Sequence, residues 1–283
     1  MQLADYDISH QYTVRVTDSR RVTPVNSDEI RELKLEILND DFSFEVGQSI
    51  GVLIKGPHDL GHPLHFRLYT IADMPNPENN HIIEILVKRI NYIDEYSGEK
   101  YAGIASNFLC DRKAGDRFVI AGPYHVPFQI PEDRTSPLLM IGMGTGIAPF
   151  RAFVKHIFEN LGGWKGPVRL YYGARTGLEC LYMNDEQDDF KNYYDEETFQ
   201  AFKVIGDRPH WNEAIGLDEK ILQHEKSIKT FLNNDSSHIF VAGHDKIQHI
   251  LNHTFSKLCG SEKMWQQQKQ KMLEQNRWHE LIY

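Results

Sequence analysis

The sequence has only three cysteines among its 283 residues, Cys110, Cys180 and Cys259, and they lie far apart. Three thiols cannot supply the four ligands of an iron–sulfur cluster, and their spacing is unlike that of a disulfide framework. Long apolar runs are also missing, because no stretch approaches the ~18 apolar residues of a membrane-spanning helix. The N-terminus lacks a basic stretch followed by an apolar one, so the sequence predicts a cytoplasmic protein with no membrane span.

Positive charge is scarce. Lysine and arginine number 31 against 40 aspartates and glutamates, which gives a formal net charge of −9. Nucleic-acid binding needs a dominant basic face, so this balance argues against a nucleic-acid partner. The length is sufficient for two domains, since single hydrophobic cores commonly stop growing near ~200–300 residues.

The first part of the chain, residues 1–131, shows mainly a two-residue period. Leu33, Leu35 and Ile37 alternate with Lys34 and Glu36. Short β-like runs follow at 51–54, 66–71, 81–87 and 118–121, separated by turn signals. Many short alternating strands between turns predict a small antiparallel β-barrel.

The second part, residues 132–283, has a different texture. It begins after a polar, proline-bounded linker at about 131–137. Apolar strand candidates at 138–142, 168–172, 201–205, 238–242 and 278–283 alternate with helical stretches. This alternation predicts an α/β domain with a parallel sheet covered by helices.

A glycine-rich turn follows the first of these strands. The apolar run that starts at Leu138 ends in Gly142, Gly144 and Gly146, and apolar residues then recur at helical spacing from Phe150. A helix N-terminus at such a turn offers free N–H groups and the positive end of the helix dipole, so the pattern suits phosphate binding. Tight packing alone is the other explanation of such a turn.

Three motifs in order resemble the plant-type ferredoxin–NADP reductase family: Arg67-Leu68-Tyr69-Thr70, the segment 103–111 and the segment 144–151. The resemblance runs from about residue 10 to Tyr283. It implies an FAD-binding antiparallel β-barrel domain followed by an NADP(H)-binding α/β domain. Segments 182–186 and 278–283 resemble most the reductase components of bacterial benzoyl-CoA epoxidases, which carry an additional ferredoxin-like segment that this chain lacks.

The resemblance assigns FAD contacts to the barrel. It implies that Arg67 neutralises the diphosphate, that Tyr69 lies against the isoalloxazine ring, and that Thr70, in place of the family's serine, acts catalytically through its hydroxyl. Tyr92 would stack on the adenine. The remaining implied FAD contacts are Leu68, Gly103, Ile104, Ala105, Ser106 and Thr145. Structural alternatives are a strand aromatic at 69, a solvated arginine at 67, a barrel-rim aromatic at 92 and a helix-capping Ser106.

The resemblance also assigns NADP(H) contacts. Lys88 would reach the nucleotide phosphates, unless it is an ordinary surface lysine. The implied pyrophosphate cradle consists of Gly144, Thr145, Gly146, Ile147, Ala148 and Pro149. Arg175 and Arg208 are candidates for the 2′-phosphate, and Ala242 and Gly243 for the nicotinamide end. Tyr283 would cover the flavin as a displaceable lid and is the second implied catalytic residue.

Two positions depart from the family pattern. Ala242 stands where the family has a cysteine, and Leu281 stands where it has a carboxylate. Glu280 is adjacent, but alternation along a strand would point it to the opposite face, so it receives no catalytic role.

The resemblance therefore predicts an enzyme in which NADPH gives a hydride to FAD and single electrons pass to a ferredoxin or flavodoxin-like carrier. No metal is expected. One alternative is a dedicated reductase component of a monooxygenase or epoxidase system, with an oxygenase as partner. Another is a nucleotide-binding partner module without turnover.

Overall fold

The computed structural model describes residues 5–56, 63–76, 81–125, 128–195, 197–205 and 216–283. The chain divides into two compact units, Met1–Val126 and Pro127–Tyr283. The division lies at 126/127 rather than at 131/132. The reason is Phe128, which is buried and places its ring against those of Phe150, Phe153 and Phe240 in the second unit.

The first unit is built on a six-stranded antiparallel sheet with the order β4-β3-β8-β1-β2-β5. Its strands are β1 (Gln11–Arg21), β2 (Ile30–Ile37), β3 (Ser49–Lys55), β4 (Leu64–Thr70), β5 (Ile82–Lys88) and β8 (Arg117–Tyr124). An isolated bridge between Ile71 and Ile85 joins the two edge strands at one end, which closes the sheet into a barrel there. The predicted antiparallel architecture is confirmed, and β1 is a strand that the expected runs omit.

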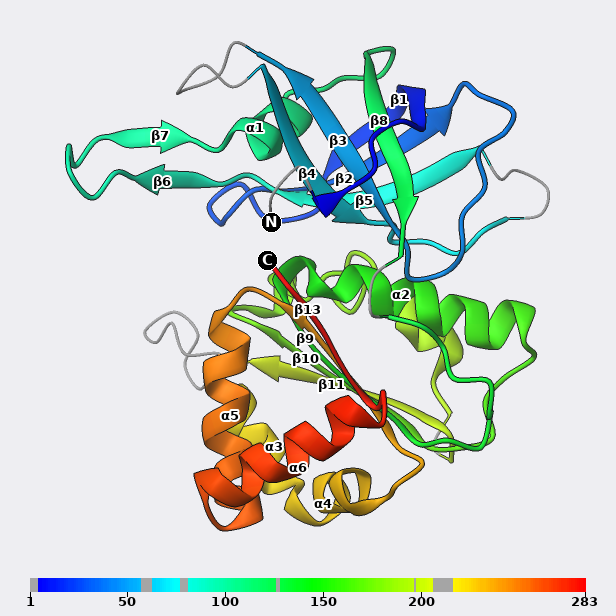
Figure 1. Ribbon diagram of the computed structural model, residues 1–283, viewed down its shortest axis with the longest axis vertical. Coiled ribbons are helices and arrows are strands. Elements are labelled where there is room, and N and C mark those ends of the chain that lie inside the picture. Colours follow the sequence, from blue (N-terminus) through cyan, green and yellow to red (C-terminus); the bar gives the residue numbers. More distant parts are fainter. Residues whose placement is uncertain (1–4, 57–62, 77–80, 126–127, 196, 206–215) are drawn as a thin grey trace. The chain divides into compact units, whose positions relative to one another are not determined.

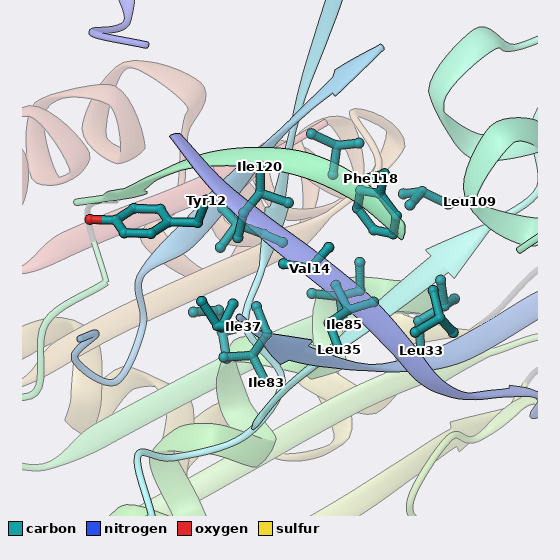
Figure 2. Close-up of a cluster of buried hydrophobic side chains, with 14 of the residues drawn as sticks. Tyr12, Val14, Leu33, Leu35, Ile37, Ile83, Ile85, Leu109, Phe118 and Ile120 are labelled. Carbon is teal, nitrogen blue, oxygen red and sulfur yellow. The ribbon is translucent and has the colours of Figure 1, made fainter. Parts of the chain in front are cut away.

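Inward-facing side chains of the alternating strands form the core of this unit (Figure 2). Val14, Leu33, Leu35 and Ile85 are completely buried. Each such side chain contributes roughly 1.5–3 kcal/mol relative to an exposed one. Leu109 of the helix α1 (Ile104–Cys110) is part of this core, so α1 is packed against the barrel.

A short two-stranded hairpin precedes α1. It consists of β6 (Asn91–Ile93) and β7 (Lys100–Ala102), and it projects away from the barrel sheet (Figure 1). All six strand residues are exposed.

The second unit contains a five-stranded, all-parallel sheet with the order β11-β10-β9-β12-β13. The strands are β9 (Leu138–Met143), β10 (Val168–Ala174), β11 (Phe199–Ile205), β12 (His238–Gly243) and β13 (Trp278–Ile282). Their near-continuous apolar runs suit a sheet that is buried on both faces. The predicted parallel sheet is confirmed.

Helices cover both faces of this sheet, with α2 on one face and the other described α-helices of the unit on the opposite face (Figure 1). The helix α2 (Ile147–Lys155) continues into a π-helical turn, His156–Asn160, and the chain then reverses at Gly162 and Gly163, which both have positive φ. The other described α-helices are α3 (Leu217–Gln223), α4 (Glu225–Asn233), α5 (Lys246–Cys259) and α6 (Glu262–Glu274).

Within the ranges described above, no helix is both long and apolar enough to cross a membrane. The same ranges contain no group of three or more histidine, cysteine, aspartate or glutamate side chains arranged to hold a metal ion.

Candidate functional site

The motif Arg67–Thr70 forms the end of β4. The side chain of Arg67 is exposed, whereas Tyr69 is partly buried and packs against the barrel core. Burial raises the pKa of the Tyr69 phenol above its ordinary value. Leu68 packs on the other face of β4, beside Phe66. The strand thus presents an exposed cation next to an aromatic ring that is packed against the core.

A buried hydroxyl orients Thr70. The Oγ1 atom of Thr70 lies 3.1 Å from Oγ of Ser49, which is 1% exposed and sits opposite Thr70 in the β3–β4 register. Either hydroxyl can donate in this pair, so Thr70 keeps hydrogen-bonding capacity for a ligand. Sequence reasoning missed Ser49, because only the strand register identifies it as the partner of Thr70.

The N-terminus of α1 is compatible with an anion. Gly103 is the N-cap, no side chain caps the helix, and its first turn contains no acidic residue. The backbone N–H groups of Ile104, Ala105 and Ser106 precede the first intrahelical hydrogen bond. Ser106 does not act as the cap: its hydroxyl accepts a hydrogen bond from the N–H of Ile90 at 3.1 Å and faces the Gly103 carbonyl.

Two further residues of the first unit have partners of their own. Tyr92 is 49% exposed and stacks on Tyr101 across the β6–β7 hairpin, with 5.8 Å between the ring centroids. Lys88 forms an ion pair of 2.8 Å with Asp28, and the two side chains are 40% and 46% exposed. A surface pair of this kind contributes little stability, about 0–1 kcal/mol, so a phosphate could displace Asp28 at small cost.

In the second unit, the three glycines after β9 have three different environments. A Cβ on Gly142 would meet the ring of Phe150, and one on Gly146 would lie 2.2 Å from the carbonyl oxygen of Ala242. Gly144 has a φ of +57° and no heavy atom within 4 Å of a Cβ position. Gly142 and Gly146 therefore serve close packing, whereas Gly144 supplies the left-handed turn and faces open space.

The turn Gly144–Gly146 leads directly into α2. The side chains of Ile147, Ala148 and Pro149 are buried, so these residues can offer a ligand only their backbone. Pro149 lies in the first turn of α2, where its missing N–H costs no helical hydrogen bond. This turn therefore presents an uncapped helix end without acidic side chains.

Several of the predicted NADP(H) residues meet at the carboxyl edge of the sheet. The hydroxyls of Thr145 and Tyr283 are 2.6 Å apart, and the N–H of Tyr283 donates to the carbonyl of Gly243 at 3.2 Å. Ala242, which stands where the resemblance implies a cysteine, is completely buried, and its methyl group offers no reactive atom.

Arg175 follows β10 at the same edge. Its guanidinium forms an ion pair with Glu179 at 3.4 Å, and the Glu179 side chain is only 12% exposed. A negative charge that close reduces the attraction of Arg175 for a phosphate. Arg208, the other candidate, lies outside the described residues.

Glu280 points to the face of the sheet that α5 and α6 cover, opposite to that of its neighbour Leu281, as strand alternation predicts. Its carboxylate accepts hydrogen bonds from Lys269 at 2.6 Å, from the indole of Trp278 at 2.6 Å and from Gln248 at 2.8 Å. Burial opposes ionisation of Glu280, but these hydrogen bonds outweigh it and leave its pKa below the ordinary value. Glu280 thus anchors β13 to α5 and α6.

Taken separately, both units have donors that fit the cofactors implied by the sequence. In the first unit α1 packs against β5 and against β4, the strand that holds Arg67 and Tyr69, and the N-terminus of α1 is uncapped. In the second unit the space around a Cβ position of Gly144 is open, beside the uncapped start of α2. Both arrangements suit a diphosphate group.

The comparisons with known proteins agree with this geometry. Residues 140–270 match the family model of the oxidoreductase NAD-binding domain. The ferredoxin–NADP reductase of Picosynechococcus is 26% identical over 268 residues, which cover 91% of this chain and 66% of that protein. The chloroplastic leaf-type isozyme of Nicotiana tabacum is 29% identical, over 85% of this chain and 68% of its own length. The chain is similar to ferredoxin–NADP reductases. It spans about two thirds of the length of these two relatives.

A solved structure supports the fold. The ferredoxin–NADP⁺ reductase from Plasmodium falciparum superimposes with a TM-score of 0.73, covers 98% of both chains and is 20% identical. The arrangement of an antiparallel sheet unit followed by a parallel sheet unit is therefore shared with this reductase.

Proposed function

We propose that the protein is an FAD-containing, NADP(H)-dependent oxidoreductase of the ferredoxin–NADP reductase type, which delivers electrons to a ferredoxin or a flavodoxin-like carrier. The observation that carries the proposal is the glycine turn at Gly144, which lies within the matched NAD-binding domain and opens onto free space at the N-terminus of α2. When bound, FAD supplies the conversion between two-electron hydride transfer and single-electron transfer.

The side chains of the first unit have distinct tasks in this proposal. Arg67 binds the flavin diphosphate through its rigid, permanently charged fork. Tyr69 supplies a flat, water-excluding surface, since its ring is already held by the barrel core. Thr70 offers its hydroxyl to the reacting edge of the ring system, with Ser49 fixing the orientation of that hydroxyl.

The second unit binds the nucleotide in this proposal. The cradle Gly144–Pro149 binds the pyrophosphate through backbone N–H groups and the hydroxyl of Thr145. Arg175 contributes charge for the 2′-phosphate, balanced by Glu179. Tyr283 lies beside this cradle and acts as the displaceable aromatic group.

An anaerobic titration tests the proposal. The purified protein should be yellow, NADPH should bleach its flavin absorbance, and subsequent addition of a ferredoxin or flavodoxin should restore that absorbance. A protein that is colourless and does not take up added FAD would contradict the proposal. Arg67→Ala should weaken FAD binding, whereas Arg117→Ala, an exposed strand arginine of the same unit, should not.

The resemblance to benzoyl-CoA epoxidase reductases supports a narrower alternative, a reductase dedicated to one oxygenase. In that case an oxygenase would reoxidise the reduced protein faster than ferredoxins or flavodoxins do. The other alternative is a nucleotide-binding module without turnover. Such a module would not reduce ferricyanide with NADPH, so this assay distinguishes it from an enzyme.

We also infer that the protein works in a reducing compartment such as the cytoplasm. Cys110, Cys180 and Cys259 are all free thiols, and burial raises the pKa of Cys110 and of Cys180 to about 11. Disulfides are rare in such a compartment, so free cysteines suit it.

A further inference from the structure

Tyr172 places a buried hydroxyl directly beneath the glycine turn. It lies on β10, and its side chain is completely buried. Its hydroxyl donates a hydrogen bond to the carbonyl oxygen of Gly144 at 2.8 Å. The carbonyl oxygen of Glu179 lies farther from the same hydroxyl, at 3.5 Å, so the bond to Gly144 is the shorter of the two. Because a carbonyl oxygen can only accept, the direction of the bond between Tyr172 and Gly144 is fixed.

The bond persists over the ordinary pH range. Burial raises the pKa of Tyr172 well above its ordinary value, with the neighbouring Cys180 as a smaller cause. The phenol therefore stays protonated at neutral pH and remains a donor to the Gly144 carbonyl.

Holding this carbonyl has a consequence for the next amide. The peptide bond between Gly144 and Thr145 is planar and trans, so the N–H of Thr145 points opposite to the carbonyl of Gly144. The carbonyl faces Tyr172 and also accepts from the N–H of Ile147 at the start of α2. The N–H of Thr145 is consequently turned away from the sheet and from the body of α2.

Gly144 makes this anchoring necessary. Glycine can adopt several backbone conformations of similar energy, and the φ of +57° at Gly144 is one of them. No side chain crowds this residue. The N–H of Ile147 is the other donor to this carbonyl. Without the Tyr172 hydroxyl, one hydrogen bond in place of two would fix the peptide plane, and the N–H of Thr145 would be aimed less firmly at a ligand.

We propose that Tyr172 is a positioning residue for the diphosphate of a dinucleotide: by holding the Gly144 carbonyl, it aims the Thr145 N–H at that group. Tyr172 itself lies below the turn and does not touch the ligand. The inference rests on the proposed function, because it requires that the turn binds the diphosphate of NADP(H).

The neighbouring residue provides a matched control. Tyr171 lies on the opposite face of β10, within the core formed with α3 to α6, and its hydroxyl is 2.7 Å from Nδ1 of His224. Tyr171→Phe and Tyr172→Phe each remove one phenolic oxygen, and the two residues are neighbours on β10. Tyr171→Phe breaks a buried hydrogen bond without affecting the turn.

The experiment is calorimetric titration of the purified full-length protein with two probes, NADP⁺ and adenosine 2′-monophosphate, which lacks the diphosphate. We expect Tyr172→Phe to weaken NADP⁺ binding about tenfold, the effect of one well-placed hydrogen bond, and to change binding of adenosine 2′-monophosphate less than about twofold. Tyr171→Phe should leave both affinities unchanged. Thermal unfolding of each variant shows any loss of stability separately.

Three results would overturn the inference. Equal weakening of both probes would mean general damage to the unit, and unchanged NADP⁺ affinity would mean that the Gly144 carbonyl needs no anchor. If the wild-type protein binds neither probe, the proposed function fails and the inference fails with it. That last outcome differs visibly from the first two, in which the wild type binds.

A second measurement applies if Tyr172→Phe does not fold. Amide hydrogen exchange in the wild-type protein should show the N–H of Thr145 exchanging more slowly when NADP⁺ is added, and unchanged when adenosine 2′-monophosphate is added. Exchange at Thr145 that does not respond to NADP⁺ would overturn the inference.

Discussion

The hydroxyls of Thr145 and Tyr283 lie 2.6 Å apart, although the two residues are separated by 138 positions in the chain. Tyr283 is also held by its backbone N–H, which donates to the carbonyl of Gly243. Its side chain nevertheless remains 53% exposed. The side chain of Tyr283 thus contacts the Gly144–Pro149 cradle through its hydroxyl, and about half of its surface is exposed.

This contact predicts the effect of Tyr283→Phe on nucleotide affinity. A diphosphate that takes the Thr145 hydroxyl must first break the bond to Tyr283, so loss of the phenolic oxygen should tighten NADP⁺ binding. A partly exposed hydrogen bond contributes about 0.5–1 kcal/mol, which corresponds to a two- to fivefold lower Kd. Titration calorimetry measures it, with Tyr194→Phe, another half-exposed tyrosine, as control. Weaker binding by Tyr283→Phe would contradict the proposed competition.

The ion pair between Arg175 and Glu179 predicts a change in nucleotide preference. Glu179→Gln removes a carboxylate that lies 3.4 Å from the guanidinium, so Arg175 should attract a 2′-phosphate more strongly. We expect kcat/KM with NADPH to rise about three- to tenfold relative to NADH, about 1 kcal/mol. Arg175→Ala should shift the ratio the other way. Steady-state kinetics with both nucleotides decides, and equal ratios in the three proteins would exclude this pair as the determinant.

The hydroxyl pair of Thr70 and Ser49 predicts which substitutions slow flavin reduction. Thr70→Val keeps the shape but removes the hydroxyl, and we expect the rate of reduction by NADPH to fall by about 10- to 100-fold. Thr70→Ser keeps the hydroxyl and should stay within about threefold of the wild type. Anaerobic stopped-flow measurement of flavin absorbance gives these rates. A wild-type rate in Thr70→Val would remove Thr70 from the catalytic residues.

Glu280 predicts a dependence of stability on pH. Its pKa in the folded protein is below the ordinary 4.5, so its hydrogen bonds stabilise the fold above about pH 4.5. That contribution is lost as the pH falls through the lowered pKa. Glu280→Gln should therefore reduce the free energy of unfolding by about 1–3 kcal/mol at pH 7, and by less at pH 3.

Urea unfolding at several pH values tests this expectation. The control is Glu274→Gln, which alters an exposed carboxylate of α6 that accepts a hydrogen bond from Gln270. A difference between wild type and Glu280→Gln that stays constant from pH 7 to pH 3 would show that ionisation of Glu280 is not involved.

Much of the fold follows from local sequence patterns. The alternation of Leu33, Leu35 and Ile37 specifies β2, because side chains on successive strand residues point to opposite faces. The uninterrupted apolar run from Leu138 specifies β9, since both faces of a central parallel strand are buried. The apolar alternation of strand β1 covers only its first half, because its second half, from Thr17 to Arg21, is polar and largely exposed.

The sequence by itself determined the order of the strands and helices, the glycine turn before α2 and the residue types available for cofactor binding, because these depend on spacing along one segment. Only the tertiary structure decided the partners that are distant in sequence: Ser49 for Thr70, and the Tyr172 hydroxyl for the carbonyl of Gly144. Each partner is reached either across a strand pair or around a turn. Which side chains meet there depends on register and on which face of a strand is buried, and neither is encoded in a single segment.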